Sequence, residues 1–89
     1  MQALLLRAHR EGGPTQAVLA CVARGGALEA EALALGELHR AGWRILEVMP
    51  PDEVRRHMPG LKRLPLAAAA MASARVRGMA FAVLELPET

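Results

Sequence analysis

The sequence has 89 residues, the size of one domain, and we therefore predict a single domain over residues 1–89. Apolar residues make up 53% of the chain and aromatic residues only 2%, so the core must be built mainly from aliphatic side chains and alanine. The net charge of +2 hides an asymmetry, because residues 1–53 sum to −2 whereas every charge in residues 55–77 is positive. The single cysteine, Cys21, excludes an internal disulfide framework.

The same features indicate a compartment. A lone cysteine favours a reducing cytoplasm, and the first ten residues lack the basic start and long apolar run of a secretory signal. We therefore expect a cytoplasmic protein. Arginine outnumbers lysine ten to one and asparagine is absent. This pattern is typical of a GC-rich bacterial genome and is compatible with a thermophilic source.

Two strands joined by a hairpin are predicted at the start of the chain. Residues 3–9 and 15–24 are rich in Leu and Val, and Gly12-Gly13 between them can adopt positive φ. A helix follows over residues 27–41, ended by Gly42. Its predicted apolar face has four members at helical spacing: Leu28, Ala32, Leu35 and Leu38.

The second half of the chain continues with a strand over 43–49, which the prolines at 50 and 51 end. A short helix is predicted over 51–58, stopping before Pro59, and then a loop over 59–64. A helix from Pro65 to Gly78 and a strand over 79–86 complete the order β-β-α-β-α-α-β.

This order predicts an α+β fold, a two-layer sandwich with about four strands and both main helices on one face. The passage from the helix at 27–41 into "GWRILEV" loosely resembles half of a ferredoxin-like fold. The resemblance implies an architecture and no activity.

Self-association is predicted from the strands. Residues 17–23 and 79–84 are apolar on both faces, which is typical of central strands covered on both sides. Two helices on one face would leave the other face open, so we expect an obligate homodimer burying roughly 800 Å² per subunit or more. A loop folded over the sheet, or a helix at 15–24, would remove that expectation.

The alanine-rich run at 66–78 has three candidate interpretations. The overlapping uninterrupted run of small and apolar residues, 64–74, is far shorter than the roughly 20 residues of a membrane span. A nucleic-acid arm would need further basic or stacking groups beside Arg75 and Arg77. We therefore predict a structural helix that packs closely through alanine, with Met71 and Val76 supplying the larger contacts.

A basic segment is the clearest hint of a charged partner. Its four cations flank an "MPG" turn and are candidate contacts for an anion or a nucleic acid: Arg55, Arg56, Lys62 and Arg63. The segment has no aromatic side chain for stacking on bases. A solvated basic face is the favoured interpretation, and weak nucleic-acid binding is the alternative.

Catalytic and metal motifs are sparse. The three histidines are far apart in sequence and form no metal-binding motif, so no metal or cofactor is predicted. Cys21 is expected in the core, and Glu53 with His57 forms a solvated i,i+4 pair. If the protein is an enzyme using a dimer cleft, the candidate pocket residues are His39, Trp43 and His57.

The favoured functional hypothesis is a small, non-enzymatic homodimer that works as a regulatory or protein-interaction module. Weak nucleic-acid binding through the basic segment is the second hypothesis, and a small enzyme is the third.

Overall fold

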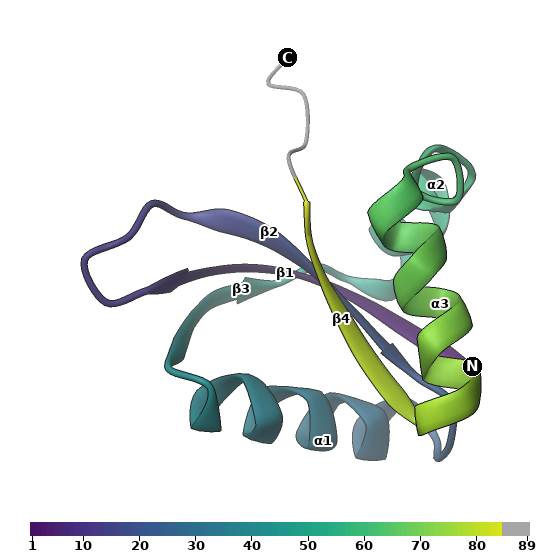
Figure 1. Cartoon of the computed structure of the whole chain (residues 1–89), viewed down its shortest axis with the longest axis horizontal. Coiled ribbons are helices and arrows are strands. Elements are labelled where there is room, and N and C mark those ends of the chain that lie inside the picture. The colour runs from purple at the N-terminus through teal and green to yellow at the C-terminus, as the bar shows by residue number, and fades with distance from the viewer. Residues whose placement is uncertain (85–89) are drawn as a thin grey trace.

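The computed structural model describes residues 1–84 and contains seven elements in the predicted order β-β-α-β-α-α-β. They are β1 (Gln2–Arg10), β2 (Gln16–Val22), α1 (Ala27–Arg40), β3 (Trp43–Val48), α2 (Pro51–Leu61), α3 (Pro65–Arg77) and β4 (Met79–Leu84) (Figure 1). The predicted α+β class and the four-stranded sheet are confirmed. The last two residues of the strand predicted at 79–86 lie outside the described residues.

The sheet is antiparallel throughout, with the order β3-β1-β2-β4. β2 is an inner strand, as its two apolar faces predicted. The prediction that residues 79–84 form a central strand is wrong, because within residues 1–84 β4 pairs only with β2 and forms one edge of the sheet. β3 forms the opposite edge.

The helices lie on both faces of the sheet. Neighbouring residues of a strand point to opposite faces, and Leu5 belongs to a core cluster with α2 and α3 whereas Leu6 belongs to a cluster with α1. Figure 1 shows α1 below the sheet and α2 and α3 at its right. The predicted placement of both main helices on one face is therefore wrong.

This arrangement removes the premise on which the sequence predicted a homodimer. The inner strand β2 is buried on both sides within a single chain: Leu19 and Cys21 face α2 and α3, and Val18 and Ala20 face α1. No open central face needs a second subunit. A homodimer stays a prediction and requires a different physical basis.

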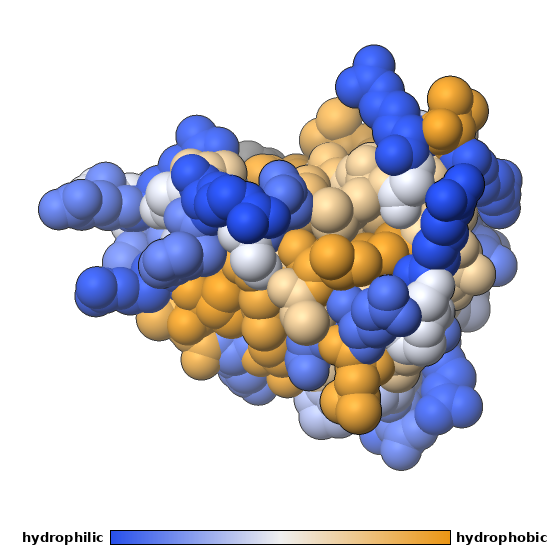
Figure 2. Space-filling model, turned by 90° about the horizontal axis from the view of Figure 1, so that it is seen from below, coloured by the Kyte–Doolittle hydropathy of each residue, from blue (hydrophilic) through white to orange (hydrophobic). Residues whose placement is uncertain are grey.

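The predicted apolar face of α1 is confirmed for Leu38 and for the partly buried Leu35, and is wrong for Leu28 and Ala32. The buried residues of this helix are Ala30, Ala34 and Leu38, whereas Leu28 is 83% exposed and Ala32 is also exposed. The small alanine side chains let the helix backbone lie close to the sheet. Leucines at the same positions would hold the helix farther away. Figure 2, seen from the α1 side, shows hydrophobic surface across this face between hydrophilic side chains.

The helix α2 continues past Pro59, where the sequence predicted its end. Val54 and Leu61, two turns apart on one face of the helix, are 5% and 2% exposed in the core. The free energy gained by burying Leu61 offsets the loss of the helical hydrogen bond that Pro59 cannot donate. The backbone N–H of Lys62 then donates to the carbonyl of Met58 over 3.0 Å, so the helical bonding resumes after the proline.

Candidate functional site

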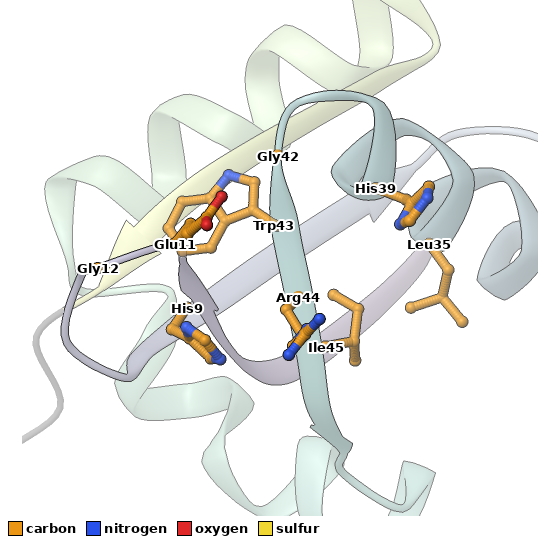
Figure 3. A pocket seen from close by; sticks show the side chains of 9 residues that line it. All are labelled: His9, Glu11, Gly12, Leu35, His39, Gly42, Trp43, Arg44 and Ile45. Atoms are coloured by element: carbon orange, nitrogen blue, oxygen red, sulfur yellow. The ribbon is translucent and has the colours of Figure 1, made fainter.

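A pocket with a volume of about 640 Å³ lies beside the outer edge strand β3. It is formed by the end of β1 and the following turn, the last turns of α1, and the start of β3 (Figure 3). Its lining residues are His9, Glu11, Gly12, Leu35, His39, Gly42, Trp43, Arg44 and Ile45. Another pocket, of about 310 Å³, lies between the start of α1 and the start of α2.

The pocket is shaped by the turn that connects α1 to β3. Gly42 has a φ of 90°, a conformation that glycine adopts without steric strain, and it lets the chain reverse directly after the helix. Trp43 then enters the core and is only 6% exposed. Its cross-strand neighbour Arg10 places its guanidinium carbon 4.7 Å from the centre of the indole ring. This cation–π contact fixes one wall of the pocket.

The next cross-strand pair places two more polar side chains at the pocket. His9 of β1 lies opposite Arg44 of β3. The Nδ1 atom of His9 is 3.2 Å from the carbonyl oxygen of Arg10, and because a carbonyl only accepts, this contact requires a proton on Nδ1. Arg44 is exposed and takes part in none of the ion pairs found within residues 1–84.

The two histidines of the pocket do not converge. Figure 3 shows His9 on one side of β3 and His39 on the other. General acid–base catalysis needs two groups within hydrogen-bond reach of one substrate. The arrangement is therefore better suited to holding a molecule between apolar and charged side chains than to moving a proton.

The structure brings together two of the three pocket residues proposed from the sequence. His39 and Trp43 both line the pocket, whereas His57 is exposed on α2 and lies outside it. Sequence reasoning missed His9, Glu11 and Arg44. The only signal for them is the pairing of β1 with β3, which the sequence order alone does not specify.

The basic segment lies on α2 and in the turn that follows it, with all four side chains exposed. Arg55 is paired with Asp52 of the same helix over 2.5 Å, so part of its charge is already compensated. Nucleic-acid binding through the segment stays a prediction. Glu53 and His57, the predicted i,i+4 pair, form no ion pair or hydrogen bond in the described part of the chain.

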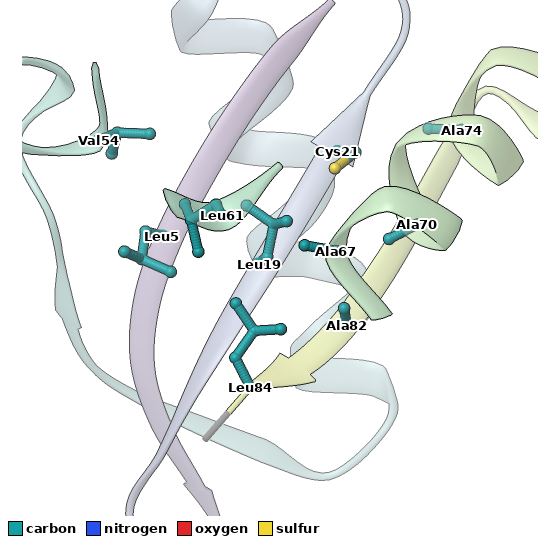
Figure 4. Packing of buried hydrophobic residues seen from close by; sticks show 10 residues of the cluster. All are labelled: Leu5, Leu19, Cys21, Val54, Leu61, Ala67, Ala70, Ala74, Ala82 and Leu84. Carbon is teal, nitrogen blue, oxygen red and sulfur yellow. The ribbon is translucent and has the colours of Figure 1, made fainter. Parts of the chain in front are cut away.

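The alanine-rich helix α3 packs on the sheet as a structural element. Ala67, Ala70 and Ala74 are buried in one row and face Leu19 and other core residues of β2 and β4 (Figure 4). The expectation that Val76 supplies a core contact is wrong, because its side chain is 87% exposed. Met71 is half-buried against the core.

Cys21 is a core residue on β2, as predicted, and is fully buried (Figure 4). Burial removes the thiol from water, which disfavours the thiolate and raises the pKa of Cys21 above its ordinary value. The thiol is therefore a poor nucleophile in the folded protein. Across residues 1–84, no three His, Cys, Asp or Glu side chains lie close enough together to hold a metal ion.

We expect the buried Cys21 thiol to make the domain less stable at alkaline pH. The folded state keeps the proton while the unfolded chain releases it, so stability is complete below the unfolded pKa of about 8.5 and falls by up to about 1.4 kcal/mol per pH unit above it. Urea unfolding at several pH values between neutral and alkaline measures this slope. Cys21→Ala should flatten it, and an equally steep slope in that variant would show that another group is responsible.

Comparisons with family models, with curated proteins and with solved structures found no match to this chain. The loose ferredoxin-like resemblance consequently stays a prediction. In the part of the chain that the structure describes, no helix is both long and apolar enough to cross a membrane.

Proposed function

We propose that this protein is a small, non-enzymatic, cytoplasmic interaction module that works as a homodimer, and that the dimer forms through β4 together with the outer side of α3. The observation that carries the proposal is the edge strand β4, "MAFAVL", which has no charged residue, no proline and two large apolar side chains at the surface. Such an edge is a template for pairing with another strand.

The hydrogen-bonding register shows which backbone groups of β4 are directed outward. The N–H of Ala23 donates to the carbonyl of Gly78 over 2.8 Å, and bonded pairs alternate along an antiparallel ladder. Ala80 and Ala82 therefore bond to β2. The N–H and C=O groups of Met79, Phe81 and Val83 point away from β2.

The two edges of the sheet differ in how they are protected. β3 carries Arg44 and Glu47, and its pairing with β1 is interrupted by an irregularity between Arg7 and Ala8. Charges and bulges on an edge strand discourage pairing with another chain. β4 has neither feature, and Phe81 and Val83 are 36% and 37% exposed. The contrast supports β4 as the edge used for assembly.

The helix α3 adds apolar surface on the neighbouring element. Leu66 and Val76 are 63% and 87% exposed, and residues 65–74 contain no charged side chain. Within residues 1–84, four of the eight exposed large hydrophobic side chains belong to the consecutive elements α3 and β4. A helix that is apolar all round is typical of a buried position, so this surface fits a protein partner better than solvent.

A second copy of the chain is the partner that β4 fits most simply. An antiparallel strand pair can have a twofold axis, so two identical β4 strands can exchange their outward N–H and C=O groups. With the axis at Phe81, Met79 pairs with Val83 of the other subunit and the two Phe81 side chains become neighbours. The paired strands would span about 20 Å and join the two sheets into one.

The distribution of polar side chains supports binding over catalysis. His39 and His57, the candidate acid–base residues of the enzyme hypothesis, lie on α1 and α2, which pack on opposite faces of the sheet. One substrate could not reach both within a subunit. A surface that pairs strands and buries apolar side chains requires no such convergence.

Light scattering after size-exclusion chromatography tests the proposal. At micromolar concentration we expect twice the 9.5 kDa mass of the chain. Phe81→Lys places a charge at the centre of the paired strands and should give the monomer mass. Leu46→Lys is the matched control, because Leu46 is a 53% exposed hydrophobic residue on the opposite edge strand and should leave the dimer intact.

A cross-linking experiment distinguishes β4 from other interfaces. Phe81→Cys should be joined into a covalent dimer by a short bismaleimide reagent, whereas Leu46→Cys should not, and Cys21 is buried in both variants. A monomer mass for the wild-type protein contradicts the proposal. A dimer that cross-links equally at both positions, or that Phe81→Lys does not dissociate, contradicts the assignment to β4.

A further inference from the structure

We infer that the pocket beside β3 is a binding site for a small monoanionic carboxylic acid with an apolar or aromatic body. This inference does not rest on the dimer, because the pocket is formed within one chain and β3 is the opposite edge of the sheet from β4.

The size and walls of the pocket fit a small organic ligand. Its volume of about 640 Å³ lies within the range of known ligand sites, roughly 300–1,000 Å³. Leu35, Trp43 and Ile45 supply apolar surface from α1 and β3. Sites of this kind combine apolar walls with a few polar groups that orient the ligand. We therefore infer that the apolar or aromatic body of the ligand packs against these apolar walls.

The charges at the pocket favour an anion. Arg44 lines it without an ion-pair partner among residues 1–84, and Arg10 stacks on the Trp43 wall. Among the lining residues the charges of Arg44 and Glu11 cancel, and the guanidinium of Arg10 on the Trp43 wall adds one positive charge that the lining residues do not balance. A single carboxylate on the ligand would balance that charge.

Arg44 is the residue expected to recognise the carboxylate. A guanidinium presents a planar fork of donors that matches the two oxygens of a carboxylate. His9, the cross-strand neighbour of Arg44, has its Nδ1 engaged with the carbonyl of Arg10. Its Nε2 is left as a second polar contact at the site. His39 lies on the other side of β3 from His9 and is assigned no contact with the ligand (Figure 3).

The protein carries its own reporter of binding, because Trp43 is its only tryptophan and lines the pocket. We propose a titration of tryptophan fluorescence with three probes of the same shape: phenylacetate, phenylacetamide and phenethylamine. Phenylacetate should give a saturable change with a Kd on the order of 1 mM, as expected for a ligand of this size. The neutral amide should bind at least about tenfold more weakly, and the amine should give no saturable change.

Two variants assign the effect to Arg44. Arg44→Gln should weaken phenylacetate binding about tenfold or more, because it removes the charged donor. Arg7→Gln is the matched control, since Arg7 is an exposed arginine that faces Glu47 at 3.8 Å and does not line the pocket. Circular dichroism verifies that both variants are folded, and sodium chloride at matched concentration controls for ionic strength.

Three outcomes overturn the inference. The first is no saturable change with phenylacetate at roughly 10 mM. The second is equal binding of the acid, the amide and the amine, which would indicate hydrophobic contact only. The third is unchanged binding by Arg44→Gln. Measuring the oligomeric state of the same samples tests the dimer proposal independently of ligand binding.

Discussion

Ala34→Glu is expected to unfold the domain. Ala34 is fully buried on α1 and packs in the cluster that contains Leu6, Val18 and Ala20 on one face of the sheet. A carboxylate at this position would lie between helix and sheet without a partner, and an uncompensated buried charge costs about 3–5 kcal/mol. A domain of this size has a total stability on the order of 5 kcal/mol, so most molecules should be unfolded.

The same helix provides the control for that variant. Ala32→Glu introduces an identical side chain on the exposed side of α1 and should change the free energy of unfolding by no more than about 0.5 kcal/mol. Urea unfolding followed by circular dichroism measures both. Equal tolerance of the two variants would contradict the packing of α1 on the sheet.

Leu19→Ala has the second-largest expected effect. Leu19 is fully buried on the inner strand β2, within the cluster formed by α2, α3 and the other face of the sheet (Figure 4). Removing its isobutyl group loses the transfer free energy and leaves a cavity, which together cost about 2–5 kcal/mol. The midpoint of urea unfolding should fall steeply at neutral pH.

A leucine on the edge of the sheet is the comparison for Leu19. Leu46→Ala removes the same atoms at a residue that is 53% exposed on β3, and it should shift the midpoint only slightly. A loss of stability as large as that of Leu19→Ala would mean that β3 is not an exposed edge.

Most of the secondary structure could be predicted from the sequence, because local signals mark it. Glycine and proline residues mark the ends of the helices. The predicted limits of α1 and α3 are therefore within one residue of the observed ones. The end of α2 could not be predicted, since it depends on burial of Leu61, a tertiary contact. Local preferences alone place the stop at Pro59.

The arrangement of the elements in space was less predictable. An apolar strand can be central or can be an edge strand with exposed hydrophobic residues, and the pattern of β4 does not distinguish these cases. Of the leucines at helical spacing on α1, Leu38 is buried and Leu28 is exposed, and alanines at positions 30 and 34 complete the face that packs closely on the sheet. The pocket depends on the pairing of His9 with Arg44 across β1 and β3. Local sequence does not determine which strands pair.

Amide hydrogen exchange along β4 tests the central claim most directly, because the outward N–H groups of this strand have no partner within residues 1–84 of the same chain. We expect the amides of Phe81 and Val83 to be protected at micromolar concentration about as well as the amide of Ala82, which bonds to β2. Their protection should decrease on dilution while that of Ala82 persists. Fast exchange at Phe81 and Val83 at every concentration, with Ala82 protected, would contradict assembly through this edge.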